Sequence, residues 1–67
     1  METGNLVRTL RDIFYRDGKF IRVPSGTVGI VIKSKQPTPS LPVGMALVRF
    51  EFCESYLYWR QLEIIND

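Results

Sequence analysis

The most reactive side chains of this sequence do not combine into a recognisable catalytic set. Its 67 residues include no histidine and one cysteine, Cys53. A Cys–His nucleophile is therefore excluded, and general base catalysis would fall to Asp, Glu, Lys or Tyr. Glu51 and Glu54 lie three positions apart and form no recognisable acid pair, and a zinc site is not expected without histidine. The sequence predicts a chain that is not an enzyme, with no catalytic residue, no metal and no cofactor.

Binding through aromatic and arginine side chains is the better-supported chemistry. Tyr56 and Tyr58 alternate with Leu57 and Trp59, so they point to the opposite face of an extended strand. If Trp59 lies in the core, the two tyrosines are exposed, and Tyr and Arg are enriched at protein interfaces. A simpler alternative is that one tyrosine only covers an open end of the fold. The predicted partner-binding residues are Tyr56, Tyr58, Arg60, Arg49, Tyr15 and Phe14.

The basic residues support a second function class, the binding of RNA or DNA. Seven of the nine lie in the first 35 residues: Arg8, Arg11, Arg16, Lys19, Arg22, Lys33 and Lys35. Aromatic side chains near them could stack on bases. Against this, Asp12 and Asp17 interrupt the set, the net charge is only +2, and a pI near 9.0 is at the edge of the range typical of such domains. Protein interaction is therefore the favoured interpretation.

Length and composition predict one domain, residues 1–67, with a small core. A chain of this size buries only roughly 60% of its unfolded surface. The apolar share of 45% is ordinary for a globular domain and argues against disorder. A single thiol fits a reducing compartment, and no apolar run approaches the roughly 20 residues of a membrane span. No signal peptide is visible at the N-terminus, so a cytoplasmic protein is expected.

The stretch that organises the fold is residues 24–35. Pro24 and Gly26 favour a turn, and the β-branched residues that follow, from Val28 to Ile32, favour a strand. Gly29 inside that strand predicts a sharp bend or the close approach of another backbone. It does not belong to a phosphate-binding loop, because a strand follows and no P-loop lysine is present.

The first half of the chain predicts a strand over residues 6–11 and a long connection over residues 12–25. The connection is rich in apolar residues and contains the turn pair Asp17-Gly18. It is expected to form an irregular hairpin packed over one open end of the fold, and a single helical turn near residues 10–15 is an alternative. A central strand over residues 28–34 follows.

The second half begins with a loop over residues 35–44, in which Pro37, Pro39 and Pro42 forbid helix and ladder pairing. This loop is either a stiff connector or a partner-binding arm. Residues 45–53 alternate as a strand, with Ala46, Val48, Phe50 and Phe52 directed to the core and Met45, Leu47, Arg49, Glu51 and Cys53 directed outward. A turn is expected at residues 54–55, followed by a strand over residues 56–60 with Leu57 and Trp59 on one face. The chain ends with a helical turn at residues 60–62 and a last strand over residues 63–65, which lies beside the first.

These elements predict an all-β fold: a small, five-stranded, half-open barrel with a long decorated loop after the first strand. Three features of the sequence are similar to motifs of Src-homology-3-like barrels, a layout that KOW-type and Tudor-like barrels share. They are the pair Gly26 and Gly29, Ala-Leu-Val-Arg-Phe at residues 46–50, and Gln-Leu-Glu at residues 61–63. With Leu-Val-Arg at residues 6–8, the chain also resembles the family of subunit O of the photosynthetic NAD(P)H–quinone oxidoreductase, although its loops differ.

This resemblance covers about half of the chain and implies a non-catalytic peripheral subunit docked on a larger, membrane-associated complex. The peptide-binding groove of Src-homology-3 domains is not implied, because the Trp pair and the late Pro-x-x-Tyr motif of that groove are missing here. The expected function is a small accessory subunit or adaptor that binds a partner protein or complex, and nucleic acid is the alternative partner. A homodimer through the outward-facing Met45 and Leu47 is compatible with either.

Overall fold

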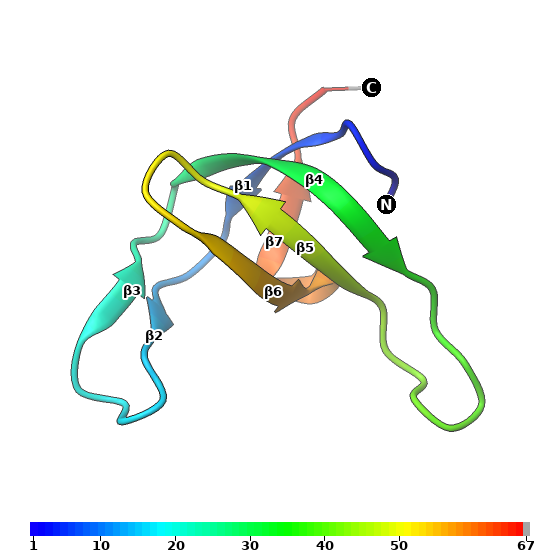
Figure 1. Ribbon diagram of the computed structural model, residues 1–67, viewed down its shortest axis with the longest axis horizontal. Helices are drawn as coiled ribbons and strands as arrows, with labels where there is room; N and C mark the ends of the chain where they lie inside the picture. Colours follow the sequence, from blue (N-terminus) through cyan, green and yellow to red (C-terminus); the bar gives the residue numbers. More distant parts are fainter. Residues whose placement is uncertain (67) are drawn as a thin grey trace.

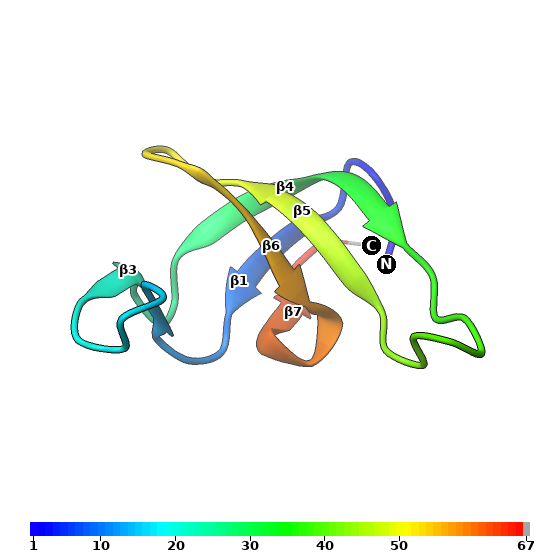
Figure 2. The same cartoon turned by 60° about the horizontal axis from the view of Figure 1, so that its bottom comes forward.

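A computed structural model describes residues 1–66 as two antiparallel sheets (Figure 1). The larger sheet has the strand order β6-β5-β4-β1-β7, and β2 and β3 form a separate hairpin. The strands are β1 (Leu6–Thr9), β2 (Ile13–Phe14), β3 (Ile21–Val23), β4 (Val28–Lys35), β5 (Met45–Arg49), β6 (Glu54–Tyr58) and β7 (Leu62–Ile64), with a short 3-10 helix, η1 (Trp59–Gln61), between the last two. The all-β class is confirmed. The five-stranded sheet arches (Figure 2), and no closed barrel is formed among the described residues.

The core lies on one face of this sheet because apolar residues alternate along its strands. Its buried side chains are Val7, Val23, Val31, Ala46, Val48, Phe50, Leu57 and Leu62. The predicted inward positions Ala46, Val48 and Phe50 are thus confirmed. Val23 reaches the core from the hairpin, and the half-buried Ile13 packs against it.

The prediction that Phe52 is a core residue is wrong, since 58% of its surface is exposed. Strand β5 ends at Arg49, and the Phe50 N–H donates a hydrogen bond of 2.7 Å to the Cys53 carbonyl. The chain therefore turns at residues 50–53, four residues earlier than alternation alone predicts, and β6 begins at Glu54 where a turn was expected. The ring of Phe52 stacks against Phe50, with centroids 6.3 Å apart.

The close approach predicted at Gly29 is confirmed. A Cβ at this buried position would lie 2.6 Å from Val48 Cγ1 and 2.8 Å from the Arg49 carbonyl oxygen. The turn before it is also confirmed, with the Thr27 N–H donating to the Pro24 carbonyl and Gly26 at a φ of 83°. The irregularity of β4 lies further on: Val31 is opposite Val48 and Lys33 is opposite Leu47, so Ile32 is an extra residue, a β-bulge.

Residues 12–25 form the expected irregular hairpin, and the alternative of a helical turn over residues 10–15 is wrong because β2 begins at Ile13. The hairpin is not packed over an open end, however. Phe14, Tyr15 and Phe20 are 52%, 54% and 66% exposed, and the hairpin projects to one side of the larger sheet (Figures 1 and 2). Only its inner end, at Ile13 and Val23, packs on the core.

The C-terminal elements are a short 3-10 helix and an edge strand that pairs with β1. The helical turn predicted at residues 60–62 is η1, one residue earlier, and β7 pairs with β1 as expected. Trp59 begins η1 instead of continuing β6 and packs half-buried against the core, where its Nε1–H donates to the Met45 carbonyl at 2.9 Å. In residues 1–66, no helix has the length and apolar character that crossing a bilayer requires.

Candidate interaction surface

The pairing of β5 with β6 creates an exposed apolar surface on the outer side of the sheet. Met45 lies opposite Tyr58 and Leu47 lies opposite Tyr56, whereas the intervening Ala46 and Leu57 are buried. Cross-strand neighbours on one face of an antiparallel pair are close enough for their side chains to touch. We call the surface formed by Met45, Leu47, Tyr56 and Tyr58 the tyrosine face.

Both tyrosines of this face are accessible, with 45% of Tyr56 and 37% of Tyr58 exposed. Neither ring is buried in the core, which favours the interpretation in which both are available for binding. A cation lies over each ring: Lys35 Nζ is 5.1 Å from the Tyr56 ring centroid, and Arg60 Cζ is 5.0 Å from that of Tyr58. These distances are within the range of a cation–π interaction, so both rings are held in place while they stay open to solvent.

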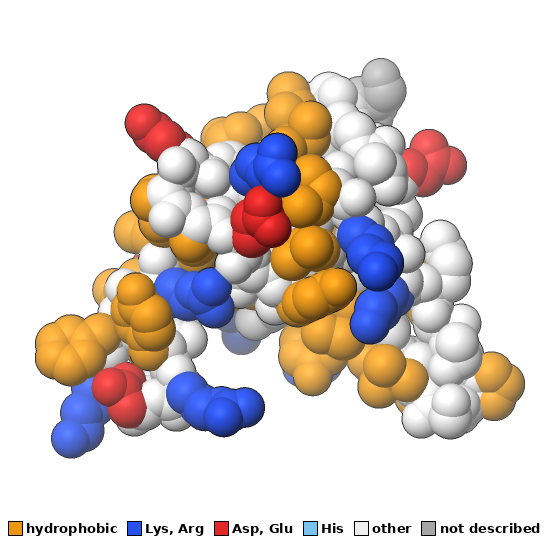
Figure 3. Space-filling model, viewed as in Figure 1, with side chains coloured by type: hydrophobic (Ala, Val, Ile, Leu, Met, Phe, Trp, Pro, Cys, Tyr) orange, Lys and Arg blue, Asp and Glu red, His pale blue; other side chains and the backbone are white. Residues whose placement is uncertain are grey.

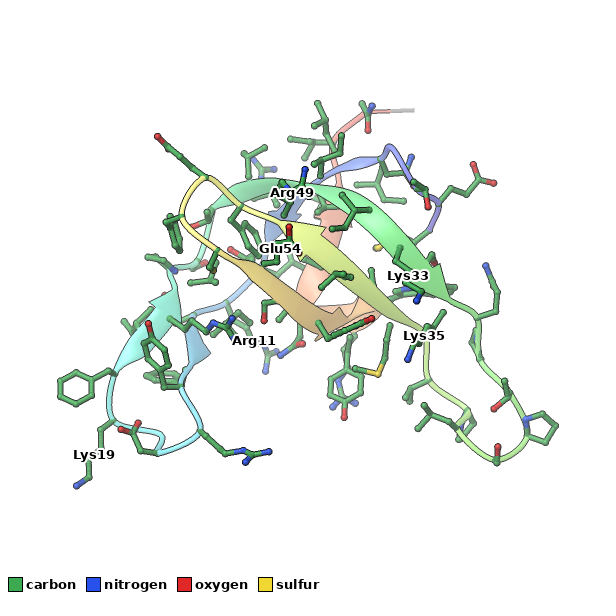
Figure 4. All side chains as sticks on the ribbon, viewed as in Figure 1. Arg11, Lys19, Lys33, Lys35, Arg49 and Glu54 are labelled. Atoms are coloured by element: carbon green, nitrogen blue, oxygen red, sulfur yellow. The ribbon has the colours of Figure 1, made fainter. Side chains whose placement is uncertain are left out.

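Two lysines form one margin of the tyrosine face because of the bulge at Ile32. Lys33 is opposite Leu47 and Lys35 is opposite Met45. Without the extra residue, period-2 alternation from the buried Val31 would direct both lysines to the core. Lys33 and Lys35 lie together on this side (Figure 4), and Figure 3 shows the band of hydrophobic side chains running over β5 and β6 between basic groups.

Arg49 and Glu54 end the tyrosine face at the start of β6. The Arg49 Nε atom donates to Glu54 Oε2 at 2.9 Å, and both side chains are about half exposed. Because the two charges are paired, the positive character of the surface comes from Lys33, Lys35 and Arg60. The structure thus brings together four of the predicted partner-binding residues, Tyr56, Tyr58, Arg49 and Arg60, and adds two lysines that the sequence assigned to nucleic acid.

Phe14 and Tyr15 do not join this surface. They belong to β2 and to the turn that follows it, on the projecting hairpin. The hairpin is tied to the larger sheet through Arg22, whose Nη2 donates to the Glu54 carbonyl at 2.7 Å. Of the six predicted partner-binding residues, Phe14 and Tyr15 therefore lie apart from the other four.

The seven basic residues predicted as a nucleic-acid set are likewise divided. Arg8 lies at the β1–β7 edge, where it forms a 2.8 Å ion pair with Glu63. Arg11, Arg16, Lys19 and Arg22 lie in or beside the hairpin, and Lys33 and Lys35 border the tyrosine face (Figure 4). They do not form one continuous basic surface.

Over residues 1–66, no pocket is found, and no group of three or more His, Cys, Asp or Glu side chains is placed to hold a metal ion. Cys53 is a half-buried free thiol packed against the core. No family model and no curated protein matches the sequence, and no solved structure matches the fold.

Proposed function

We propose that this chain is a non-catalytic protein-interaction module, a small accessory subunit or adaptor that docks on a larger protein complex through its tyrosine face. One observation carries the proposal: two exposed tyrosines, each covered by a cation, lie beside Met45 and Leu47 on a regular two-stranded ladder. Such a surface offers large contact area with few side-chain torsions to fix on binding.

The composition of the tyrosine face supports a protein partner with an acidic margin. Tyr and Arg supply most of the strongest contacts at protein interfaces, usually in a centre that excludes water. Tyr56, Tyr58 and Leu47 would form that centre, and Lys33, Lys35 and Arg60 would lie at its margin. Charges at a margin contribute mainly to association rate and choice of partner, so carboxylates are the expected complement.

We further propose that the fold is a half-open Src-homology-3-like barrel. The antiparallel order of the five strands, the long connection after β1 and the 3-10 turn before β7 support this layout. The similarity to the subunit O family would place the partner in a membrane-associated complex, with this chain bound at its periphery. That assignment rests on the three short sequence stretches at residues 6–8, 46–50 and 61–63.

The test is affinity capture from native lysate by the tagged wild-type chain, by the double variant Tyr56→Ala/Tyr58→Ala and by the control Phe52→Ala. Phe52 is a matched control because it is an exposed aromatic residue outside the tyrosine face. All captures are treated with nuclease and quantified by mass spectrometry. We expect one protein partner at a constant ratio to bind the wild type and the control, and to fall at least tenfold in the double variant.

The double variant should keep a native circular dichroism spectrum, because both rings lie outside the core. Equal recovery by a folded double variant would refute docking through the tyrosine face. Light scattering of the purified chain provides a further check. A dimer that the double variant abolishes would assign the face to self-association through Met45 and Leu47 in place of a different partner.

A further inference from the structure

The hairpin region carries all of the chain's excess charge. Residues 11–22 contain four basic and two acidic side chains, a net charge of +2. The whole chain has nine basic and seven acidic residues, which is also +2, so the remaining residues are balanced. The net charge of the whole chain is small, but its positive excess lies on the β2–β3 hairpin, which projects from the sheet (Figure 1).

The two acids of this segment are already engaged by backbone groups. Asp12 Oδ1 accepts a 2.7 Å hydrogen bond from the Ser25 N–H, and Asp17 Oδ1 accepts a 2.9 Å bond from the Lys19 N–H. Salt bridges in residues 1–66 join Arg8 to Glu63 and Arg49 to Glu54. In that part of the chain, Arg11, Arg16 and Lys19 are exposed and have no carboxylate partner.

Exposed aromatic residues lie near these cations in the sequence: Phe14 and Tyr15 lie between Arg11 and Arg16, and Phe20 follows Lys19. Phe14 is the cross-strand neighbour of Ile21, and the Tyr15 N–H donates a 2.9 Å hydrogen bond to the Phe20 carbonyl. These two successive cross-strand pairs carry three exposed rings: Tyr15 and Phe20 share one face of the hairpin, and Phe14, one residue before Tyr15, alternates to the other face. Ile13, Val23 and the Arg22–Glu54 hydrogen bond hold the base of the hairpin on the sheet, so the rings have a fixed support.

We propose that this hairpin, residues 11–23, binds single-stranded nucleic acid. Aromatic rings are stacking platforms for unpaired bases, and a basic groove or ribbon follows the phosphates. Tyr15 and Phe20, which share a face, stack on successive bases, Phe14 offers a further ring on the other face, and Arg11, Arg16 and Lys19 contact phosphates. The site is separate from the tyrosine face, and it adds a second binding function to the proposed one.

The shape of the hairpin favours a nucleic acid strand over an anionic membrane. Its end is the polar turn Arg16-Asp17-Gly18-Lys19, in which Gly18 has a φ of 71°. A bilayer would have to accept this charged turn, including the Asp17 carboxylate, before the aromatic rings reached the acyl region. A flexible strand can lie across the rings with its phosphates beside the cations.

The experiment is fluorescence anisotropy with a labelled oligothymidylate and a labelled oligouridylate of about 12 nucleotides, within the length range of single-strand sites. The cation variant is Arg11→Ala/Arg16→Ala/Lys19→Ala, and the ring variant is Phe14→Ala/Tyr15→Ala/Phe20→Ala. The control is Lys33→Ala/Lys35→Ala, which removes two exposed cations from the other surface. Amide NMR spectra establish that each variant is folded.

We expect the wild type and the control to bind with a slope of log affinity against log salt of about −2, since each of three phosphate contacts on a single strand contributes roughly −0.7. The cation variant should lose most of this slope. The ring variant should bind at least about fivefold more weakly for each ring that stacks. If the ring variant fails to fold, the cation variant still tests the site, because its side chains are exposed.

The proposal is overturned if neither oligonucleotide binds at millimolar protein, if both hairpin variants bind like the wild type, or if only the lysine control loses affinity. Binding to phosphatidylserine vesicles without binding to oligonucleotides would also overturn it and would assign the hairpin to a membrane surface.

Discussion

At the scale of single residues, two positions that carry no binding chemistry hold the surfaces in place. Gly29 lets β4 lie directly against the β5 backbone and Phe50. Thr9 is buried, and its hydroxyl donates to the Pro24 carbonyl at 2.8 Å and accepts from the Thr27 N–H at 3.1 Å. These bonds fix the turn that starts β4, the strand that contributes both lysines of the tyrosine face.

The variant Gly29→Ala should destabilise the fold by about 1–3 kcal/mol, the usual cost of overpacking a core. The added Cβ would lie 2.8 Å from a carbonyl oxygen that the β4–β5 pairing holds in place, so the backbone has to shift. Urea unfolding measures the loss, with the exposed Lys33→Ala on the same strand as a control. An unchanged unfolding midpoint for Gly29→Ala would show that the close packing is not required.

At the scale of elements, the irregular features decide what the surfaces contain. The bulge at Ile32 turns Lys33 and Lys35 outward, and the early end of β5 moves Phe52 to a loop and starts β6 at Glu54. The hairpin has an irregularity of its own between Ile13 and Phe14. Its attachment at Arg22 sets where the rings of the hairpin lie relative to the larger sheet.

The variant Arg22→Ala should loosen the hairpin and leave the larger sheet intact. It removes the 2.7 Å hydrogen bond to the Glu54 carbonyl, whereas Val23 and Ile13 still pack on the core. We expect faster amide hydrogen exchange at Tyr15, whose N–H bonds to Phe20, and a change in global stability within about 1 kcal/mol. Exchange rates measured by NMR at Tyr15 and at Val48 separate the two effects, and equal acceleration at both sites would contradict local attachment.

At the scale of the whole molecule, one small core supports the two exposed surfaces that we propose bind partners. Seven of the eight buried apolar residues come from the strands of the larger sheet and from β3, and the eighth, Phe50, lies in the turn after β5. No strand of that sheet therefore has a core of its own. The tyrosine face and the hairpin lie on different parts of the surface (Figures 1 and 3). A chain of this arrangement could bring a protein and a nucleic acid strand together.

The chain should therefore unfold in one cooperative transition. Trp59 packs against the core, so its fluorescence reports the same event that circular dichroism measures over the backbone. The heat capacity change should be about 0.8–1.0 kcal/mol/K at roughly 12–15 cal/mol/K per residue. Calorimetry with both spectroscopic probes tests this expectation, and separate midpoints for fluorescence and circular dichroism would indicate a second cooperative unit.

The sequence predicted the strands whose apolar residues alternate regularly. It placed Val48 and Leu57 in the core and Tyr56 and Tyr58 on the outside, because a period of two follows from strand geometry alone. It failed where a single residue changes the register. The turn at residues 50–53 contains no proline or glycine, the residues that usually indicate a turn. The Ile32 bulge lies inside an apolar run whose composition predicts a regular strand.

The sequence alone was enough to predict the class of the fold and the buried positions Ala46, Val48, Phe50 and Leu57. These follow from periodicity, proline positions and turn residues, which act over short distances along the chain. The tertiary structure decided which exposed side chains share a surface: it separated Phe14 and Tyr15 from Tyr56, and joined Lys35 to Tyr56. Cross-strand register and the packing of the hairpin base control these neighbours, and both depend on contacts between residues far apart in sequence.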